Sequence, residues 1–399
     1  MLYIGILILL VLASYYYDYK GYSFRKNELF ILCCVIFITV IGFRYRIGGD
    51  SLHYEKQYFE TPLLYNLFSH NITDFKFEPG FTLLLSIFRT IFPDTFIPFQ
   101  LTLAIFINVI IFRFYYKYSV NPFLAIILYY FYYYFYFNCE ILRQAIAICI
   151  FLSSWKYFIE HKWIKYYSLT VIALSFHSSA IVCILLPILY IPILRSWFQI
   201  NYKYCILLIS TIIFVVLSNT LFIEYIYQIN LFSGLTDTMD SYSTRIQTES
   251  SINLNNLING FLKNIIYPIT ALLTATYYVK NKKKSTSVQF IIAINGILGL
   301  ASVGIDMIFR LCAYFFPFII LVLSQWCFKP IKIKRCIYNL SYPIWFIIMI
   351  PMLISPINNF NAPIEGTSLK MGMRYYPYNS IFFQEKDINR EKLIQYMDS

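Results

Sequence analysis

The residues Arg143 and Gln144, with Glu140 just before them, interrupt a stretch that is otherwise apolar from about residue 122 to residue 176. The segments on both sides have the composition of membrane-spanning helices. A charged side chain at that depth costs roughly 2.5–3.5 kcal/mol on insertion scales, so it is seldom retained without a partner or a task. The cluster predicts a protein that handles a polar, anionic molecule at the edge of its hydrophobic core.

Other polar residues with candidate chemistry also lie beside apolar segments, and together they could form one outward-facing cavity. Arginine presents a rigid fork of donors that suits phosphate oxygens. Carboxylates and imidazoles could supply general acid–base chemistry. The candidate arginines are Arg44, Arg46, Arg143 and Arg310. Arginines placed around one cavity would fit a lipid-linked diphosphate whose polyprenyl tail lies in the bilayer. The candidate acids and bases are Asp50, His53, Glu55, Glu78, Glu140 and His177.

Each of these residues also has a purely structural explanation. The Gly48-Gly49 pair could only turn the chain, and Arg44 and Arg46 could reach lipid headgroups. His177 could be a satisfied interfacial histidine. The pairs Asp306/Arg310 and Glu140/Arg143, spaced four and three apart, could form ion pairs along a helix. The number of arginines at one membrane boundary favours a shared anion site over these separate explanations.

Familiar motifs for other chemistries are missing from the sequence. It contains no Ser/His/Asp triad, no metal-ligand cluster and no nucleotide-binding fingerprint. The nine cysteines are scattered through apolar segments without metal-ligand spacing. We therefore expect no metal and no cofactor, and no soluble activated donor.

Composition identifies the broad class. Of the 399 residues, 59% are hydrophobic and only 13% are charged, whereas ordinary soluble domains carry about 25% charged residues. The net charge of +12 does not indicate nucleic acid, because most of the basic residues lie in short connectors, which stay cytoplasmic under the positive-inside rule. These connectors lie near residues 20–26, 113–117, 156–165, 195–203, 280–284 and 329–335.

Placing those connectors inside predicts an all-α polytopic membrane protein, a single integral membrane domain over residues 1–399, with both termini outside. The apolar segment Gly80–Phe92 is too short for a span and breaks the parity, so Glu78–Pro98 is expected to be a re-entrant or interfacial element that enters from outside. The outer parts are then loops at about 44–79 and 224–257 and a tail at about 356–399. About twelve spans are predicted near residues 2–17, 28–43, 97–113, 121–137, 141–159, 163–177, 179–194, 203–223, 258–279, 287–305, 310–328 and 337–355.

Several short motifs, taken in order, resemble the EpsG family of Wzy-like polysaccharide polymerases of capsule, exopolysaccharide and O-antigen pathways. The resemblance covers about residues 40–195, and extends more loosely to Asp306-x-x-x-Arg310 and to Tyr376-Pro377-Tyr378. No single motif is specific for the family, but the order of the motifs inside a multispan protein is specific. The motifs are Arg44-x-x-x-Gly48-x-Asp50 with Tyr54, Glu78-x-Gly80-Phe81, Leu142-Arg143-Gln144-x-Ile146-Ala147 and Phe176-His177-Ser178-Ser179-Ala180.

The resemblance implies a glycosyltransferase of GT-C-like architecture in the bacterial cytoplasmic (inner) membrane, with its active site on the outer face. It would join undecaprenyl-diphosphate-linked oligosaccharide repeat units, which serve as donor and acceptor. A flippase and a chain-length regulator are further candidate partners. His177, Asp50 and Glu78, in that order, are the candidate catalytic bases. Substrate binding is expected from Arg143, Gln144, Arg44, Arg46, Arg310, Tyr54 and Glu140.

Three other functions would use a similar cavity. A transporter or flippase of lipid-linked sugars also needs cationic residues, but it should show internal repeats, and none is found in the sequence. A membrane acyltransferase would need an acyl donor and a catalytic histidine. A ligase would share the donor and differ only in its acceptor.

Overall fold

The computed structural model describes residues 2–67, 75–199, 203–215, 267–271, 286–303, 306–328, 360–361 and 369–398. Regular structure in these parts is helical, with isolated β-bridges near Ser380 as the extended pairings that are described. The expectation of an all-helical chain is therefore confirmed for the described residues. The chain divides into two compact units, residues 1–184 with 320–399 and residues 185–319.

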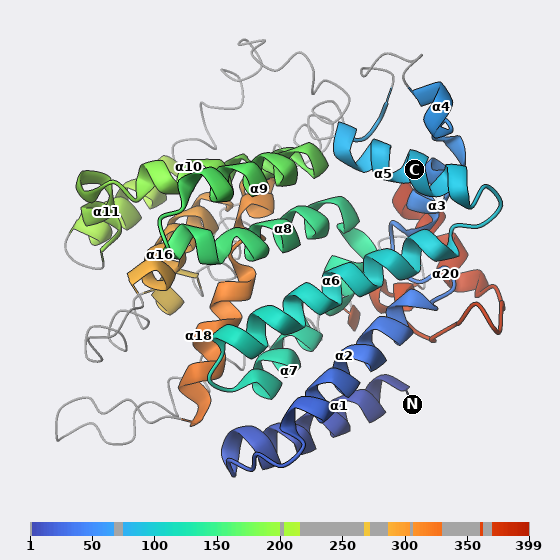
Figure 1. The fold of residues 1–399 in the computed structure, drawn as a ribbon, viewed down its shortest axis with the longest axis horizontal. Helices are drawn as coiled ribbons and strands as arrows, with labels where there is room; N and C mark the ends of the chain where they lie inside the picture. Colours follow the sequence, from blue (N-terminus) through green and yellow to red (C-terminus); the bar gives the residue numbers. More distant parts are fainter. Residues whose placement is uncertain are drawn as a thin grey trace. The chain divides into compact units, whose positions relative to one another are not determined.

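Long apolar helices make up most of the first unit (Figure 1). Helix α2 packs against α6, α6 against α8, α8 against α9, and α1 against α7. Proline stands in the first turn of α6 and of α7, where its missing N–H costs no helical hydrogen bond. The helices are α1 (Leu2–Ala13, continued by the π-helical turn η1, Ser14–Tyr19), α2 (Lys26–Gly42), α6 (Ile97–Tyr118), α7 (Pro122–Tyr132), α8 (Leu142–Ile159) and α9 (Trp163–Phe176).

Three helices among the described residues are long and apolar enough to cross a membrane, namely Leu2–Tyr19, Ile97–Tyr118 and Leu142–Ile159. A fourth span results if the bent pair Ser178–Leu189 and Pro192–Phe198 counts as one. Other apolar helices of the described chain are shorter, between 10 and 17 residues. The membrane class is thus supported, while the count of about twelve spans stays a prediction.

The segment expected to form one continuous span at 179–194 is broken. Helix α10 (Ile181–Leu189) and α11 (Pro192–Phe198) follow the short 3-10 turn η4 (Ser178–Ala180), and the two arms meet at 111°. Pro192 opens α11, and the preceding Ile191 is extended, with φ −55° and ψ 137°. A residue before proline disfavours the helical region, so the break occurs where the sequence places Pro192.

The later predicted spans are described only in part. The span expected at 287–305 corresponds to α16 (Thr286–Ala301), and the one at 203–223 to a helix at Lys203–Val215. The segment 310–328 is divided between α17 (Asp306–Cys312) and α18 (Phe316–Phe328). The predicted loop at 224–257, the predicted span at 337–355 and most of the predicted span at 258–279 lie outside the described residues.

The first predicted outer loop contains two short helices at one end of α6 (Figure 1), namely α3 (Ser51–Glu60) and α4 (Leu64–Leu67). The predicted re-entrant or interfacial element corresponds to a third short helix, α5 (Pro79–Ile91). Helix α5 buries Phe81 and Leu85 and exposes Leu83, as expected for an element covered on one side. Its 13 residues measure about 20 Å, well short of a hydrocarbon core about 30 Å thick. Its expected re-entrant or interfacial position stays a prediction.

A buried polar network positions the start of α8. Asn108 of α6 donates to the side chain of Asn138 over 2.9 Å, and Asn138 donates to the hydroxyl of Tyr129 over 3.0 Å. Asn138 belongs to the π-helical turn η3 (Tyr136–Glu140), which joins α7 to α8. Because buried amides are costly without partners, this network restrains the turn that carries Glu140.

Candidate functional site

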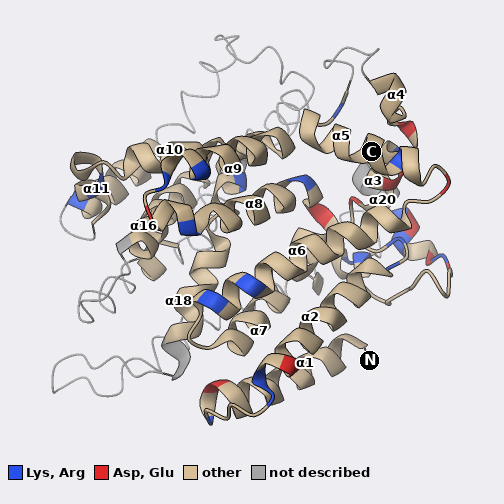
Figure 2. Ribbon diagram, viewed as in Figure 1, with Lys and Arg blue, Asp and Glu red and all other residues tan. Residues whose placement is uncertain are grey.

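Acidic and basic residues gather where α3, α20 (Ile388–Asp398) and the beginning of α8 lie near one another, whereas α2 and α7 present few charges (Figure 2). All of these elements belong to the first unit. The site is therefore built from the loop after α2, the ends of α5 and α9, the start of α8 and the C-terminal segment.

Arg44 lies inside the turn that follows α2. Only 3% of the residue is exposed, and its guanidinium donates to the carbonyls of Ile41 over 2.8 Å and Ile47 over 3.2 Å. Gln100 closes the same turn by donating to the carbonyl of Arg44 over 2.9 Å. These contacts are those of a residue that holds the turn in shape, and diphosphate binding by Arg44 stays a prediction.

The Gly48-Gly49 pair brings this loop against the turn before α8. Gly48 has φ +110°, and a Cβ there would lie 2.6 Å from the Cβ of Cys139. The backbone N–H of Gly49 donates to Glu140 Oε1 over 2.9 Å. The glycines therefore serve a close approach of two chain segments, with a carboxylate as the bound anion.

Glu140 accepts hydrogen bonds from distant parts of the chain. Its Oε1 also accepts from the hydroxyl of Tyr375 over 2.5 Å and lies 3.4 Å from Nη1 of Arg374. The Tyr54 hydroxyl donates to its main-chain carbonyl over 3.3 Å. The basic partner of Glu140 is thus Arg374, and the acidic partner of Arg143 is a different residue.

Arg143, in the first turn of α8, is paired with Glu78. Its Nη1 donates to Glu78 Oε2 over 2.5 Å, and its guanidinium stacks 4.4 Å from the ring centre of Phe77. Its Nε is buried and has no hydrogen-bond partner among the described residues. The side chain keeps 24% of its surface exposed, so this arginine is oriented by its neighbours and still accessible to a ligand.

Glu78 connects α8 to the turn that carries His177. Its Oε1 accepts from the backbone N–H of Ser178 over 3.2 Å while Oε2 holds Arg143. Burial raises the pKa of the Glu78 carboxyl, but the charge of Arg143 and the hydrogen bond from the backbone N–H of Ser178 lower it, and the net pKa lies below the usual value. An ionised carboxylate engaged on both oxygens suits an anchor better than a general base.

His177 is buried, with 6% of the residue exposed, and its ring is oriented by Ser179. Nδ1 lies 2.6 Å from the hydroxyl of Ser179 and accepts from the backbone N–H of the same residue over 3.2 Å. A backbone N–H can only donate to an unprotonated nitrogen, so the neutral ring carries its proton on Nε2. His177 is then arranged as a hydrogen-bond donor at Nε2.

Asp50 stands at the beginning of α3 and makes no side-chain capping bond to that helix. It is half-buried near Tyr54, whose phenol pKa is raised to about 12, first by burial and further by the charge of Asp50. Burial lowers the pKa of Arg374, whereas Tyr375, Glu140 and Asp50 raise it above its usual value. The Asp50 carboxylate therefore lies in the same charged cluster as Arg374.

Arg46 is bound by the C-terminal helix. Its Nε and Nη2 donate to the two carboxylate oxygens of Glu391 over 2.6 and 2.8 Å, and Nη1 lies 3.6 Å from Glu55. The hydrogen bond to Glu391 is the main reason why the pKa of Arg46 is raised. Two further predicted residues remain untested: Gln144 is buried in α8, and Arg310 is exposed on α17 in the second unit.

The residues that sequence reasoning missed belong to the C-terminal segment or flank Glu78. Arg374, Tyr375 and Glu391 lie in the tail, where the family resemblance extended only to Tyr376-Pro377-Tyr378, and Phe77 precedes a predicted site residue. The run of arginine and tyrosine at 374–378 was the available signal, because such residues pair with buried carboxylates.

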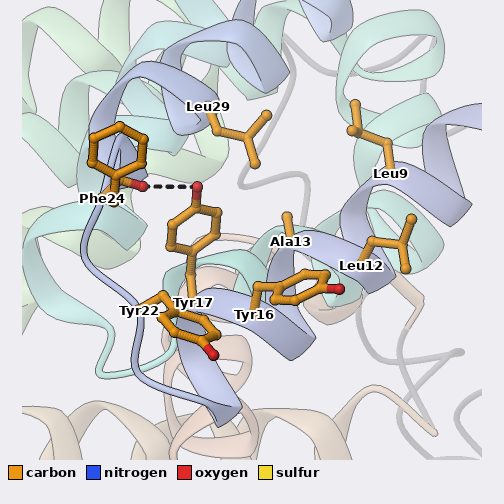
Figure 3. A pocket seen from close by; sticks show the side chains of 8 residues that line it. All are labelled: Leu9, Leu12, Ala13, Tyr16, Tyr17, Tyr22, Phe24 and Leu29. Atoms are coloured by element: carbon orange, nitrogen blue, oxygen red, sulfur yellow. Dashed lines mark hydrogen bonds between the residues drawn. The ribbon is translucent and has the colours of Figure 1, made fainter.

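A cavity of about 330 Å³ lies elsewhere, between α1, η1 and the start of α2 (Figure 3). Leucine and aromatic side chains line it, and the Tyr17 hydroxyl donates to the carbonyl of Phe24 over 3.0 Å at its edge. Its lining carries neither arginine nor carboxylate, so it cannot neutralise an anion and is not the polar site.

Comparison with known proteins finds a matching family but no individual relative. No curated protein and no solved structure matches the sequence. The model of the EpsG family matches residues 27–380, which include the loop after α2, Glu78, Arg143, His177 and Arg374. The chain therefore belongs to the EpsG family, a family of polysaccharide polymerase-like membrane proteins.

Proposed function

We propose that the protein is a glycosyltransferase that polymerises undecaprenyl-diphosphate-linked oligosaccharide repeat units on the outer face of the bacterial cytoplasmic membrane. The observation that carries this proposal is the position of Arg143, which is oriented by Glu78 and Phe77 and keeps exposed surface at the start of an apolar helix. A fixed cation at the end of such a helix suits a diphosphate whose lipid tail lies in the bilayer.

The reaction transfers the growing glycan from its lipid diphosphate to a hydroxyl of the next lipid-linked unit. The acceptor oxygen forms a bond to the anomeric carbon, its proton passes to a base, and the bond from that carbon to the diphosphate oxygen breaks. Arg143 stabilises the negative charge that accumulates on the leaving diphosphate. The products are a glycan longer by one repeat unit and undecaprenyl diphosphate.

Asp50, which lies beside Tyr54 in the charged cluster of Arg374, is our candidate for the base, while Glu78 is engaged on both oxygens and serves as an anchor. His177 would then donate a hydrogen bond to substrate oxygens. Tyr54 lies beside Asp50, but its hydroxyl donates to the main-chain carbonyl of Glu140, so substrate binding by Tyr54 stays a prediction. This assignment places Asp50 before His177, which is the first candidate in the order expected from the sequence.

The test is to incubate the purified protein with a lipid-linked repeat unit and to separate the products by size. A ladder of products supports polymerisation, and unchanged substrate with every repeat unit tried would count against it. Arg143→Lys keeps the charge but loses the planar fork, and it should lower polymer formation by about 10²–10³-fold. Arg113→Lys, at an exposed position on α6, is the matched control and should leave the ladder unchanged. A full ladder from Arg143→Lys would show that Arg143 is not a principal diphosphate ligand.

A further inference from the structure

The C-terminal segment, residues 369–398, is docked on the loop that carries the predicted site. The backbone N–H of Gly48 donates to the carbonyl of Arg374 over 3.0 Å, and that of Tyr45 donates to the carbonyl of Asn379 over 2.9 Å. Ile381 returns a hydrogen bond to the carbonyl of Phe43 over 3.0 Å. Three main-chain hydrogen bonds thus hold the two segments in one register.

This docking brings an additional cation to the site. Arg374 ends the 3-10 turn η5 (Met371–Arg374), and its Nε donates to the carbonyl of Met371 over 3.1 Å. Its Nη1 lies 3.4 Å from Glu140 Oε1, while its side chain keeps 21% of its surface exposed. The guanidinium is therefore fixed at two of its nitrogens and still accessible.

The surroundings of Arg374 and Arg143 overlap. Glu140, which holds Arg374, comes three residues before Arg143 in the chain. Tyr54 bonds the main-chain carbonyl of Glu140 and interacts electrostatically with Arg143. Asp50 interacts with both Tyr54 and Arg374. Arg143 and Arg374 therefore share neighbours, and both keep exposed side-chain surface that a ligand with two charged phosphates could contact.

Helix α20 keeps the turn of Arg374 in place. Arg390, of which only 2% is exposed, donates to the carbonyl of Met373 over 3.1 Å and also to the carbonyl of Pro377. The next residue, Glu391, binds Arg46 of the first loop on both oxygens. The helix therefore binds both the segment around η5 and the first loop, although it lies beyond residues 27–380, which the family model matches.

We propose that Arg374 is a second diphosphate-binding residue, which the docked C-terminal segment brings to the site of Arg143. This inference rests on the proposed function, because it takes the lipid diphosphate of the donor as the ligand. Glu140 and Tyr375 orient the arginine, and the diphosphate is bound from two sides, by α8 and by η5.

The first test measures binding of undecaprenyl diphosphate to the purified full-length protein. Arg374→Gln should weaken binding by roughly tenfold or more, as expected for the loss of one charge-assisted contact. Lys370→Gln, an exposed lysine at the start of the same turn, should bind like the parent. Parent-like binding by Arg374→Gln would overturn the proposal. If Arg143→Lys loses binding but Arg374→Gln keeps it, the role of Arg374 is refuted and the proposed function stands. If neither variant changes binding and the parent protein forms no ladder of polymer products, the proposed function is refuted.

A second measurement uses the parent protein and does not depend on the folding of a variant. Phenylglyoxal modifies accessible arginines, and mass spectrometry follows the rate at each position. Saturating undecaprenyl diphosphate should slow modification of Arg374 several-fold and leave that of Arg113, on the exposed side of α6, unchanged. Equal rates at Arg374 with and without the lipid would overturn the proposal.

Discussion

Replacing Glu140 by alanine tests whether one carboxylate joins the first loop, the start of α8 and the C-terminal segment. Only 7% of Glu140 is exposed. The substitution leaves the backbone N–H of Gly49 and the hydroxyl of Tyr375 without their acceptor, Oε1, at 2.9 and 2.5 Å in the parent. Burial holds the pKa of the Tyr375 phenol well above its usual value, so its proton stays in place and needs an acceptor.

The expected loss follows from these two donors. A buried donor without a partner costs about 1–3 kcal/mol, so Glu140→Ala should lower the free energy of unfolding by about 2–6 kcal/mol. Arg374 adds little, because its side chain is 21% exposed and water can solvate its charge. Glu140→Gln keeps one side-chain oxygen as an acceptor but loses the negative charge. It should lower the free energy of unfolding by about 2 kcal/mol, summed over the hydrogen bonds from Gly49 and Tyr375.

Unfolding by sodium dodecyl sulfate in mixed micelles, followed by tryptophan fluorescence, measures these differences. Glu160→Gln is the matched control, because Glu160 follows the other end of α8 and forms an exposed ion pair with Lys162 at 2.7 Å. It should unfold like the parent. If Glu140→Ala also unfolds like the parent, the buried donors have found other acceptors and the reasoning about Glu140 is wrong.

Two further predictions concern the loop after α2 and the Glu78 carboxylate. Gly48→Ala should lower the free energy of unfolding by about 1–3 kcal/mol more than Gly21→Ala does. Both glycines have positive φ, but only at Gly48 would an added Cβ lie against Cys139, at 2.6 Å. Equal losses of stability in the two variants would contradict this contact. Because the folded pKa of Glu78 is lowered, its contribution to stability is present above the unfolded pKa of about 4.3 and is lost as the pH falls through the folded value. Unfolding curves between pH 6 and pH 3, a range taken around that value, should therefore show a smaller acid-induced loss in Glu78→Gln than in the parent; parallel losses would contradict it.

The sequence was sufficient to predict those features of the fold that have a local cause in the chain. Hydropathy and charge along the chain predicted helices, and the cost of Arg143 in an apolar run marked the place where α8 begins. Pro192, which breaks the helix expected at 179–194, was visible in the sequence, but hydropathy averaged over a span does not register a single proline. Membership of the EpsG family likewise followed from short motifs in order.

Only the tertiary structure decided which charge meets which. Spacing along one helix suggested that Glu140 pairs with Arg143, whereas the chain folds so that Arg143 meets Glu78 and Glu140 meets Arg374. Arg46 and Glu391 are 345 residues apart and still share two hydrogen bonds. The electrostatic energy of a charged side chain does not depend on how far away its partner lies in the sequence. It depends on burial and on the partner that the fold brings within a few ångströms. The sequence identified candidate anion-binding residues, and the folding of the C-terminal segment onto the first loop determined which charged residues are brought together.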